Sequence, residues 1–431
     1  MNVENLRPSR EFADRLLELS RSVPVFLLVF VPLSVIYLAT ANLSTHNHID
    51  PLTNSLTAWQ LGMTGSVVMP ERAGAATEDY RGNIAWIVES PKGPVSQYPP
   101  GAAALAAPAY WLMGDPMTDW YVEGSNRRDA DAILFPLPSA APATVVAALA
   151  SAAAMGFLAA AIPYAGSSHT AAVVTGYVAG LGTTMWAVAS DALWQHGPGA
   201  MWVALGIYLA ARSWLVWSGL AFGAAILTRP DLALIAAAVG LYLSFSRRCL
   251  RPAMRVGIGS VLGLVVLLWF NWWLWGEPTV TGGYGDVFVE RLGEGSLGSY
   301  LENIAGALFD PLHGLFSYSP FLLLLIPGLR AGWRKSPDWA KGAGIGAILY
   351  LLVQLKVNRF SGGHGFLGYR YPLEALSAAG SMFFLSYANW VRERRLVNMM
   401  FWAAVAFSLV PQIWWKLWIV PTKGQEVVVA G

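Results

Sequence analysis

The sequence has few charged residues and almost no cysteine. Only 13% of its 431 residues are charged, whereas soluble domains carry about 25%. The single cysteine, Cys249, excludes an intramolecular disulfide framework and a cysteine-based metal cluster. The net charge of +2 indicates no particular partner, and we expect no nucleic-acid partner. Apolar residues make up 55% of the chain, the mean hydropathy is +0.47, and 20 Trp and 16 Tyr suit the aromatic belts of a bilayer. These features predict an integral membrane protein.

Apolar windows long enough to cross a bilayer recur along the chain. They lie at 23–41, 136–162, 170–190, 198–211, 214–229, 231–246, 253–275, 315–330, 340–357, 368–388 and 398–420. A further stretch, 99–114, is short and begins with two prolines, so we expect an interfacial helix there. The fold class predicted is all-α, a polytopic transmembrane helix bundle of about eleven spans.

Basic residues predict the orientation, because Lys and Arg concentrate on the cytoplasmic side of a membrane. No cleavage site follows the first apolar run, so residues 1–22 are expected to be a cytoplasmic segment before a retained span. With 99–114 not crossing, the short basic loops all fall on the cytoplasmic side. They contain Arg247, Arg248, Arg251 and Arg255, then Arg330, Arg334, Lys335 and Lys341, then Arg392, Arg394 and Arg395.

Two extracytoplasmic segments, 42–135 and 276–314, are much longer than the other loops. Loops of such length in compact proteins are usually functional. The first contains four tryptophans and an amphipathic stretch near 52–63, so together with 99–114 we expect interfacial helices in it. No separate soluble domain is evident, and residues 23–431 are predicted to form one transmembrane domain.

Asp50 lies in the stretch STHNHIDPLTN, directly after the first span. A carboxylate at the edge of a membrane can serve as a general base, because a low-dielectric neighbourhood raises its pKa. The alternative is an aspartate that merely precedes Pro51 in a turn. The spacing of the residues leaves both interpretations open.

Cations gather in a second extracytoplasmic stretch, LKVNRFSGGHGFLGYR. Lys356, Arg359, His364 and Arg370 occupy this one loop, among glycines that allow close backbone approach. Arginine suits phosphate through its two-pronged guanidinium. We therefore favour a phosphate site over a snorkelling interfacial cluster. Arg229, beside Pro230 and Asp231, either pairs with that acid or extends the anion site.

Other polar side chains also fall at extracytoplasmic helix ends. Each can line a sugar or acceptor pocket, and each also has a plainer interpretation as part of a solvated turn or helix end. The glycine-rich loop at 282–285 lacks the spacing of a phosphate-binding loop. These pocket candidates are Tyr98, Asp191, His196, Tyr284 and His313.

An ordered set of stretches resembles the GT-C superfamily of integral-membrane glycosyltransferases, in a bacterial subgroup of the protein mannosyltransferase and aminoarabinose transferase type. They are Asp50 after the first span, QYPPGAAALAAPAYWLMG, RRDADAILFPLPSA, GLGTTMWAVASDALWQHGP, GAAILTRPDLAL, the pair NWWLWGEPTVTGGYG and PLHGLFSYSPFLLLLIPGL, and GGHGFLGYR. The resemblance covers nearly the whole chain. In contrast to the frequent family pattern of two adjacent acids, Asp50 is followed by Pro51.

The resemblance implies an inverting transfer of a sugar from a polyprenyl-phosphate carrier to an acceptor hydroxyl at the outer face of a bacterial inner membrane. Asp50 would be the general base. Arg370, Arg359, Lys356 and His364 would stabilise the leaving phosphate, with Arg229 extending the site, and residues 282–286 would form a flap. The acceptor is a glycan, lipid or protein, and we expect no cofactor and no metal at the site.

Two other functions remain as alternatives. A transporter or lipid flippase is the main one, although transporters often show repeated halves that this sequence lacks. A polymerase or ligase that uses lipid diphosphates would also need extracytoplasmic cations and a base.

Overall fold

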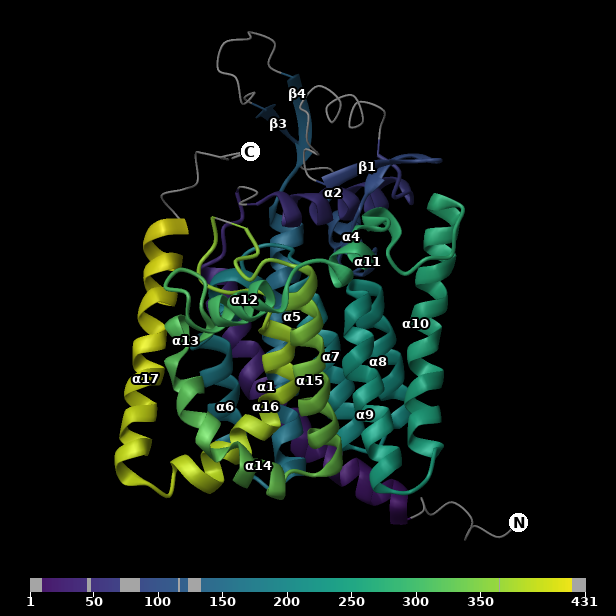
Figure 1. Cartoon of the computed structure of the whole chain (residues 1–431). Coiled ribbons are helices and arrows are strands. Elements are labelled where there is room, and N and C mark those ends of the chain that lie inside the picture. The colour runs from purple at the N-terminus through teal and green to yellow at the C-terminus, as the bar shows by residue number, and fades with distance from the viewer. Residues whose placement is uncertain are drawn as a thin grey trace, which may run out of the picture.

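The computed structural model of the chain describes residues 10–44, 48–69, 86–114, 117–122, 133–363 and 365–420 (Figure 1). The side chains of 10–22, 117–122 and 133–137 are not described. Helices run roughly side by side to form a bundle, and shorter helices and two β-hairpins lie at one end of it. The helices of the bundle are α1 Arg10–Ala39, α5 Ala141–Ala161, α6 His169–Leu181, α7 His196–Ala211, α8 Leu215–Thr228, α9 Ala233–Ser246, α10 Arg251–Trp275, α15 Asp338–Val357, α16 Leu373–Ser386 and α17 Arg395–Trp414.

The predicted spans coincide with helices, with shifted ends where proline or a strand intervenes. Residues 315–335 form a broken segment made of α13 Leu315–Tyr318, the 3-10 helix η7 Pro320–Gly328 and α14 Leu329–Lys335. Pro320 and Pro327 remove backbone donors there and prevent a continuous α-helix. The window predicted to begin at 136 contains the end of a strand, and its helix begins at Ala141. The window predicted from 368 becomes helical only at Leu373.

The outer helices present apolar side chains away from the bundle. In α10 only 28% of the apolar window is buried, and in α17 only 22%, whereas 78% is buried in α5 at the centre. Large side chains such as Ile258, Leu262 and Trp269 of α10 are exposed. Four described helical stretches are long and apolar enough to cross a membrane, and shorter apolar helices accompany them. An exposed apolar surface of this extent is stable only in lipid, so the protein is membrane-embedded.

The long segment after α1 contains more than the helices expected from its sequence. It holds α2 Ile49–Thr64, the hairpin of β1 Ile87–Ser90 and β2 Gly93–Ser96, α4 Gly101–Met113, and the hairpin of β3 Met117–Val122 and β4 Ile133–Pro138. Both hairpins are antiparallel, with Val88 opposite Val95 in the first. These short strands are the main departure from an otherwise all-α fold.

Helices α2 and α4 pack closely at this end of the bundle. A Cβ on Gly62 of α2 would lie 2.4 Å from the carbonyl oxygen of Ala107 in α4. A Cβ on Gly101, the first residue of α4, would lie 2.5 Å from the backbone nitrogen of Thr228 at the end of α8. Glycine is therefore required at both positions, because the last turn of α2 packs against α4 and the first turn of α4 packs against the end of α8.

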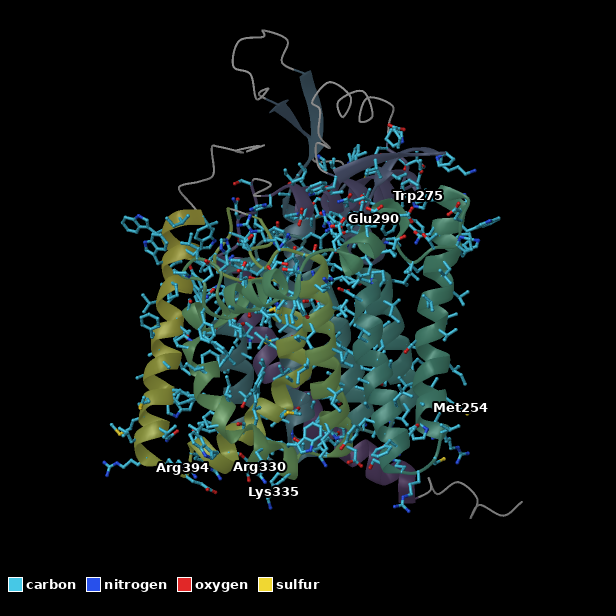
Figure 2. All side chains as sticks on the ribbon, viewed as in Figure 1. Met254, Trp275, Glu290, Arg330, Lys335 and Arg394 are labelled. Atoms are coloured by element: carbon cyan, nitrogen blue, oxygen red, sulfur yellow. The ribbon has the colours of Figure 1, made fainter. Side chains whose placement is uncertain are left out.

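The two ends of the bundle differ in charge, as the basic loops predict. Figure 2 shows Arg330, Lys335 and Arg394 together at the end opposite Trp275 and Glu290. The hairpins and α2 lie at the end of Trp275 (Figure 1). We call these the basic end and the hairpin end. Which end faces the cytoplasm stays a prediction from the positive-inside rule.

Candidate functional site

Asp50 lies in the first turn of α2, at the hairpin end of the bundle. Its Oδ2 accepts a hydrogen bond from Nη1 of Arg370, which also makes an ion pair with it. Its Oδ1 accepts one from Nε1 of Trp86 at 2.7 Å, and the hydroxyl of Tyr98 also hydrogen-bonds the carboxylate. The Asp50 side chain is 21% exposed. The carboxylate is thus fixed by three donors yet stays accessible.

Burial and charge act on the Asp50 carboxyl in opposite directions. Burial raises its pKa, but the positive charge of Arg370 and the hydrogen bonds from Arg370, Tyr98 and Trp86 outweigh this and hold the pKa below its usual value. The opposite charge likewise raises the pKa of Arg370 against the effect of burial. Asp50 is therefore an ionised carboxylate at neutral pH, contrary to the raised pKa expected for an isolated membrane-edge acid.

Arg370 connects Asp50 to the glycine-rich loop before α16. Its Nη2 donates to the carbonyl oxygen of Gly362 at 2.5 Å, and its guanidinium carbon lies 4.5 Å from the ring centroid of Trp194. Its Nε is buried and has no hydrogen-bond partner. A buried charged donor without a partner is costly, and among the described residues this Nε–H is the one unsatisfied donor of the Arg370 guanidinium.

Two tyrosines border the carboxylate. The ring centroid of Tyr98 lies 5.9 Å from that of Tyr284. Burial, and then the negative charge of Asp50, raise the pKa of both hydroxyls, so both are neutral donors at neutral pH. A Cβ on Gly283 would lie 2.4 Å from the Cα of Gln97. The glycine loop expected to form a flap thus contacts the backbone just before Tyr98.

Arg229 belongs to a second, largely buried polar cluster. Its guanidinium donates to Glu374 at 3.2 Å, to Asp231 at 3.2 Å and to the Oε1 of Gln354 at 2.6 Å. Nδ1 of His196 lies 2.9 Å from Oε1 of Glu374. Of the two possibilities for Arg229, pairing with Asp231 is the one observed, and Glu374 adds a second carboxylate.

Tyr371 connects the two clusters. Its ring lies 5.7 Å from that of His196, and its neighbour Arg370 places a guanidinium 5.1 Å from the same ring. A cavity of about 480 Å³ adjoins both clusters and is lined by Asp231, Gln354 and Tyr284, among mostly apolar side chains. Oδ1 of Asp231 and Nε2 of Gln354 are buried without hydrogen-bond partners. The cavity is therefore mostly apolar, and two of its lining residues carry buried polar atoms without partners.

Lys356 and Arg359 lie elsewhere on the hairpin end. They line a crevice of about 280 Å³ together with Arg291 and Tyr300, and Nζ of Lys356 donates to the carbonyl oxygen of Glu294 at 2.5 Å. Among the described residues, no hydrogen bond or ion pair joins either cation to Asp50 or Arg370. The cations expected to act together are thus separated, and His364, the fourth, lies outside the described residues.

Asp191 and His313 also have partners away from Asp50. Oδ1 of Asp191 accepts from Nζ of Lys416 at 2.5 Å, and the Lys416 side chain is fully buried. Nδ1 of His313 lies 3.3 Å from Asp310, and its ring contacts that of Phe366. Within the described part of the chain, no hydrogen bond or ion pair places either residue beside the Asp50 carboxylate.

Comparison with solved structures identifies the architecture. The crystal structure of ArnT from Cupriavidus metallidurans, bound to undecaprenyl phosphate, superposes with a TM-score of 0.53 at 17% sequence identity. The match covers 93% of this chain and 74% of the ArnT chain. The chain has the ArnT fold. No family description and no curated protein sequence matches it.

The ArnT fold confirms the GT-C architecture that the sequence motifs predict. In this fold Asp50, Arg370 and Tyr98 meet although Arg370 is 320 residues from Asp50. No cluster of three or more His, Cys, Asp or Glu side chains that could hold a metal ion occurs among the described residues. The expectation of a metal-free site stays a prediction.

Several side chains of these clusters were not singled out from the sequence, among them Glu374, Lys416 and Trp86. Glu374 and Lys416 are charged residues inside apolar helical windows, which is itself a recognisable sign of function or pairing. Trp86 has a positive φ of 49°, which is rare for a bulky residue. No local sequence pattern predicts this backbone conformation or the hydrogen bond from the Trp86 indole N–H to Asp50.

Proposed function

We propose that the protein is a membrane glycosyltransferase that moves a sugar from a polyprenyl-phosphate carrier to an acceptor hydroxyl, with Asp50 as general base. The observation that carries the proposal is the paired, partly exposed Asp50 carboxylate at the hairpin end of an ArnT-type bundle. The structure of ArnT contains undecaprenyl phosphate, which supports a carrier of that class.

The geometry leaves the carboxylate one unused acceptor position. A carboxylate has about four lone-pair sites, and Arg370, Trp86 and Tyr98 occupy three of them. An acceptor hydroxyl donating to the fourth would pass its proton to Asp50 as its oxygen bonds to the anomeric carbon. The bond from that carbon to the phosphate oxygen breaks on the opposite side, and this inverts the configuration. A base of this kind contributes about 10²–10⁴-fold.

Arg370 is the cation best placed for the leaving phosphate. Its buried Nε is a donor without a partner, whereas Arg229 already contacts two carboxylates and Lys356 and Arg359 line another crevice. A phosphate that shares the Arg370 charge would weaken its hold on Asp50. The pKa of Asp50 would then rise, so donor binding would strengthen the base.

The remaining assignments depend on how the protein is oriented in the membrane. With the basic end in the cytoplasm, the hairpin end and Asp50 face outward from a bacterial inner membrane. Tyr98 and Tyr284 would border the sugar, since both are neutral donors beside the base. The lipid chain of the carrier would lie within the bilayer.

Asp50→Asn tests the proposal. Purified protein is incubated with polyprenyl phosphates carrying a labelled sugar, and release of label from the lipid is measured with an extract of cell-envelope acceptors. The variant should fold and insert normally but lose transfer. Glu277→Gln, an exposed carboxylate also at the hairpin end, is the matched control and should retain transfer.

The same assay separates the alternatives. Label that stays on the lipid while the lipid crosses a vesicle membrane indicates a flippase. Transfer only from lipid diphosphates indicates a polymerase or ligase. Near-normal transfer by Asp50→Asn removes Asp50 as the base.

A further inference from the structure

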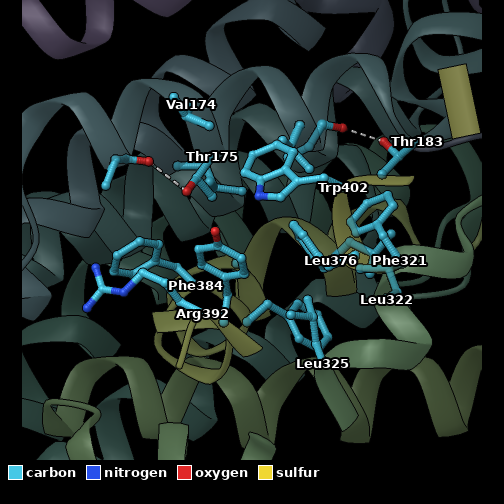
Figure 3. Close-up of a pocket in the computed structure, with 18 residues that line it drawn as sticks. Val174, Thr175, Thr183, Phe321, Leu322, Leu325, Leu376, Phe384, Arg392 and Trp402 are labelled. Atoms are coloured by element: carbon cyan, nitrogen blue, oxygen red, sulfur yellow. Dashed lines mark hydrogen bonds between the residues drawn. The ribbon is translucent and has the colours of Figure 1, made fainter. Parts of the chain in front are cut away.

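A further cavity lies within the bundle, and none of its lining residues belongs to the Asp50 and Arg229 clusters described above. It holds about 270 Å³ and is bounded by α6, η7, α16 and α17 (Figure 3). Aromatic and aliphatic side chains form its wall, among them Phe321, Leu325, Phe384 and Trp402. It lies inward of α17, the helix whose apolar window is only 22% buried.

The hydroxyl groups of this wall already have hydrogen-bond partners. The hydroxyl of Thr175 donates to the carbonyl oxygen of Ala171 at 2.8 Å, and that of Thr183 donates to Ala179 at 2.6 Å, as Figure 3 shows. The hydroxyl of Tyr387 is hydrogen-bonded to Asn398 at 3.0 Å. An occupant therefore gains nothing from these hydroxyls, and this part of the cavity suits a hydrocarbon chain.

The length of the cavity matches one leaflet of a bilayer. Its lining along α16 and the following turn runs from Leu376 to Tyr387. At 1.5 Å per residue this is about 16 Å, or about half of the 30 Å hydrocarbon core. The cavity thus has the depth of a single acyl chain that enters from one surface.

A cation stands at one end of this slot. Arg392 lines it near Phe384, and Thr183 lies at the other end (Figure 3). In the described part of the chain, the Arg392 side chain makes no hydrogen bond or ion pair. Its neighbour Arg394 lies at the basic end with Arg330 and Lys335 (Figure 2). Basic pockets between membrane helices on such a side bind anionic head groups.

We propose that this slot binds one acyl chain of an anionic phospholipid, whose phosphate pairs with Arg392. The lipid would fill the space between α17 and the helices behind it and so attach α17 to the bundle. The charge of Arg392 selects an anionic over a zwitterionic head group, and the 16 Å depth selects a leaflet lipid over a polyprenyl chain that would extend further. This site is independent of the function proposed for Asp50.

Native mass spectrometry of the delipidated full-length protein tests the proposal. Phosphatidylglycerol should bind more tightly than phosphatidylcholine with the same chains. Arg392→Gln should weaken the binding of phosphatidylglycerol by about fivefold, which is the effect of one arginine near an anionic surface. Arg395→Gln, which removes a nearby arginine that does not line the slot, should leave binding unchanged.

A second variant tests the same proposal by filling the slot with a larger side chain. Ala179→Phe should abolish binding of both lipids. Equal affinity for the two lipids, full phosphatidylglycerol binding by Ala179→Phe, or tighter binding of undecaprenyl phosphate than of phosphatidylglycerol would each overturn the proposal.

If Ala179→Phe does not fold, fluorescence quenching by brominated acyl chains replaces it. Quenching by brominated phosphatidylglycerol should fall in Trp402→Phe relative to the unaltered protein, because Trp402 lines the slot. An unchanged quenched fraction would equally overturn the assignment.

Discussion

The buried ion pair of Lys416 and Asp191 permits a prediction independent of enzymatic activity. Lys416 lies in the π-helical turn η9 Trp415–Ile419 that extends α17, and Asp191 follows the turn η4 Met185–Ala189 after α6. Their side chains are 0% and 7% exposed, and the N–O distance is 2.5 Å. Oδ1 of Asp191 also accepts from the backbone nitrogen of Asn42 at 3.3 Å. The pair therefore joins the last helix to the turn after α6 and the end of α1.

Lys416→Met removes the cation and leaves the carboxylate buried. Breaking such a pair from one side costs about 3–5 kcal/mol, whereas replacing both partners is often close to neutral. Lys416→Met should therefore destabilise the protein by about 3–5 kcal/mol, and adding Asp191→Asn should recover most of that loss. The two single changes should be strongly non-additive, because both remove the same interaction.

Unfolding in detergent, monitored by tryptophan fluorescence and by aggregation, measures the stability of the two single variants and of the double variant. Lys341→Met is the control, since Lys341 and Asp338 are 19% and 38% exposed and 3.7 Å apart. A partly exposed pair contributes about 0–1 kcal/mol. If Lys416→Met unfolds no more easily than Lys341→Met, or if the double variant is as unstable as the sum of the singles, the reasoning fails.

Further predictions concern the surroundings of Asp50. In Arg370→Gln the pKa of Asp50 should rise, because burial then acts without the compensating charge. Since kcat/KM falls as pH drops through that pKa, the acid limb of its pH profile should move to higher pH. An unmoved limb would contradict Asp50 as the titrating base. Trp86→Phe removes one donor but no charge, so the limb should move in the same direction and less far in the same pH profile. Gly283→Ala places a Cβ 2.4 Å from a neighbouring backbone carbon and should raise KM. Gly293→Ala, with open space around it, should leave KM unchanged, and equal KM values for the two glycine variants would count against the proposed loop contact.

The helices of the bundle could be predicted because hydropathy is a local property. Each apolar window holds a helix, including the one broken by Pro320 and Pro327. The hairpin of β1 and β2 was not expected, since its two four-residue strands are too short to give a clear alternating pattern. The positions of Arg330, Lys335 and Arg394 at one end follow from the order of loops and spans.

The sequence placed Asp50 at the edge of a membrane, beside loops with many cations, and its ordered motifs indicated a GT-C-like transmembrane fold. It left open which cation meets which acid. Asp50 pairs with Arg370 over 320 residues, and Asp191 pairs with Lys416 over 225. Helical periodicity and hydropathy act over a few turns and therefore specify spans. Ion pairs depend on the rotation and depth at which distant helices pack, and only the tertiary structure decided these.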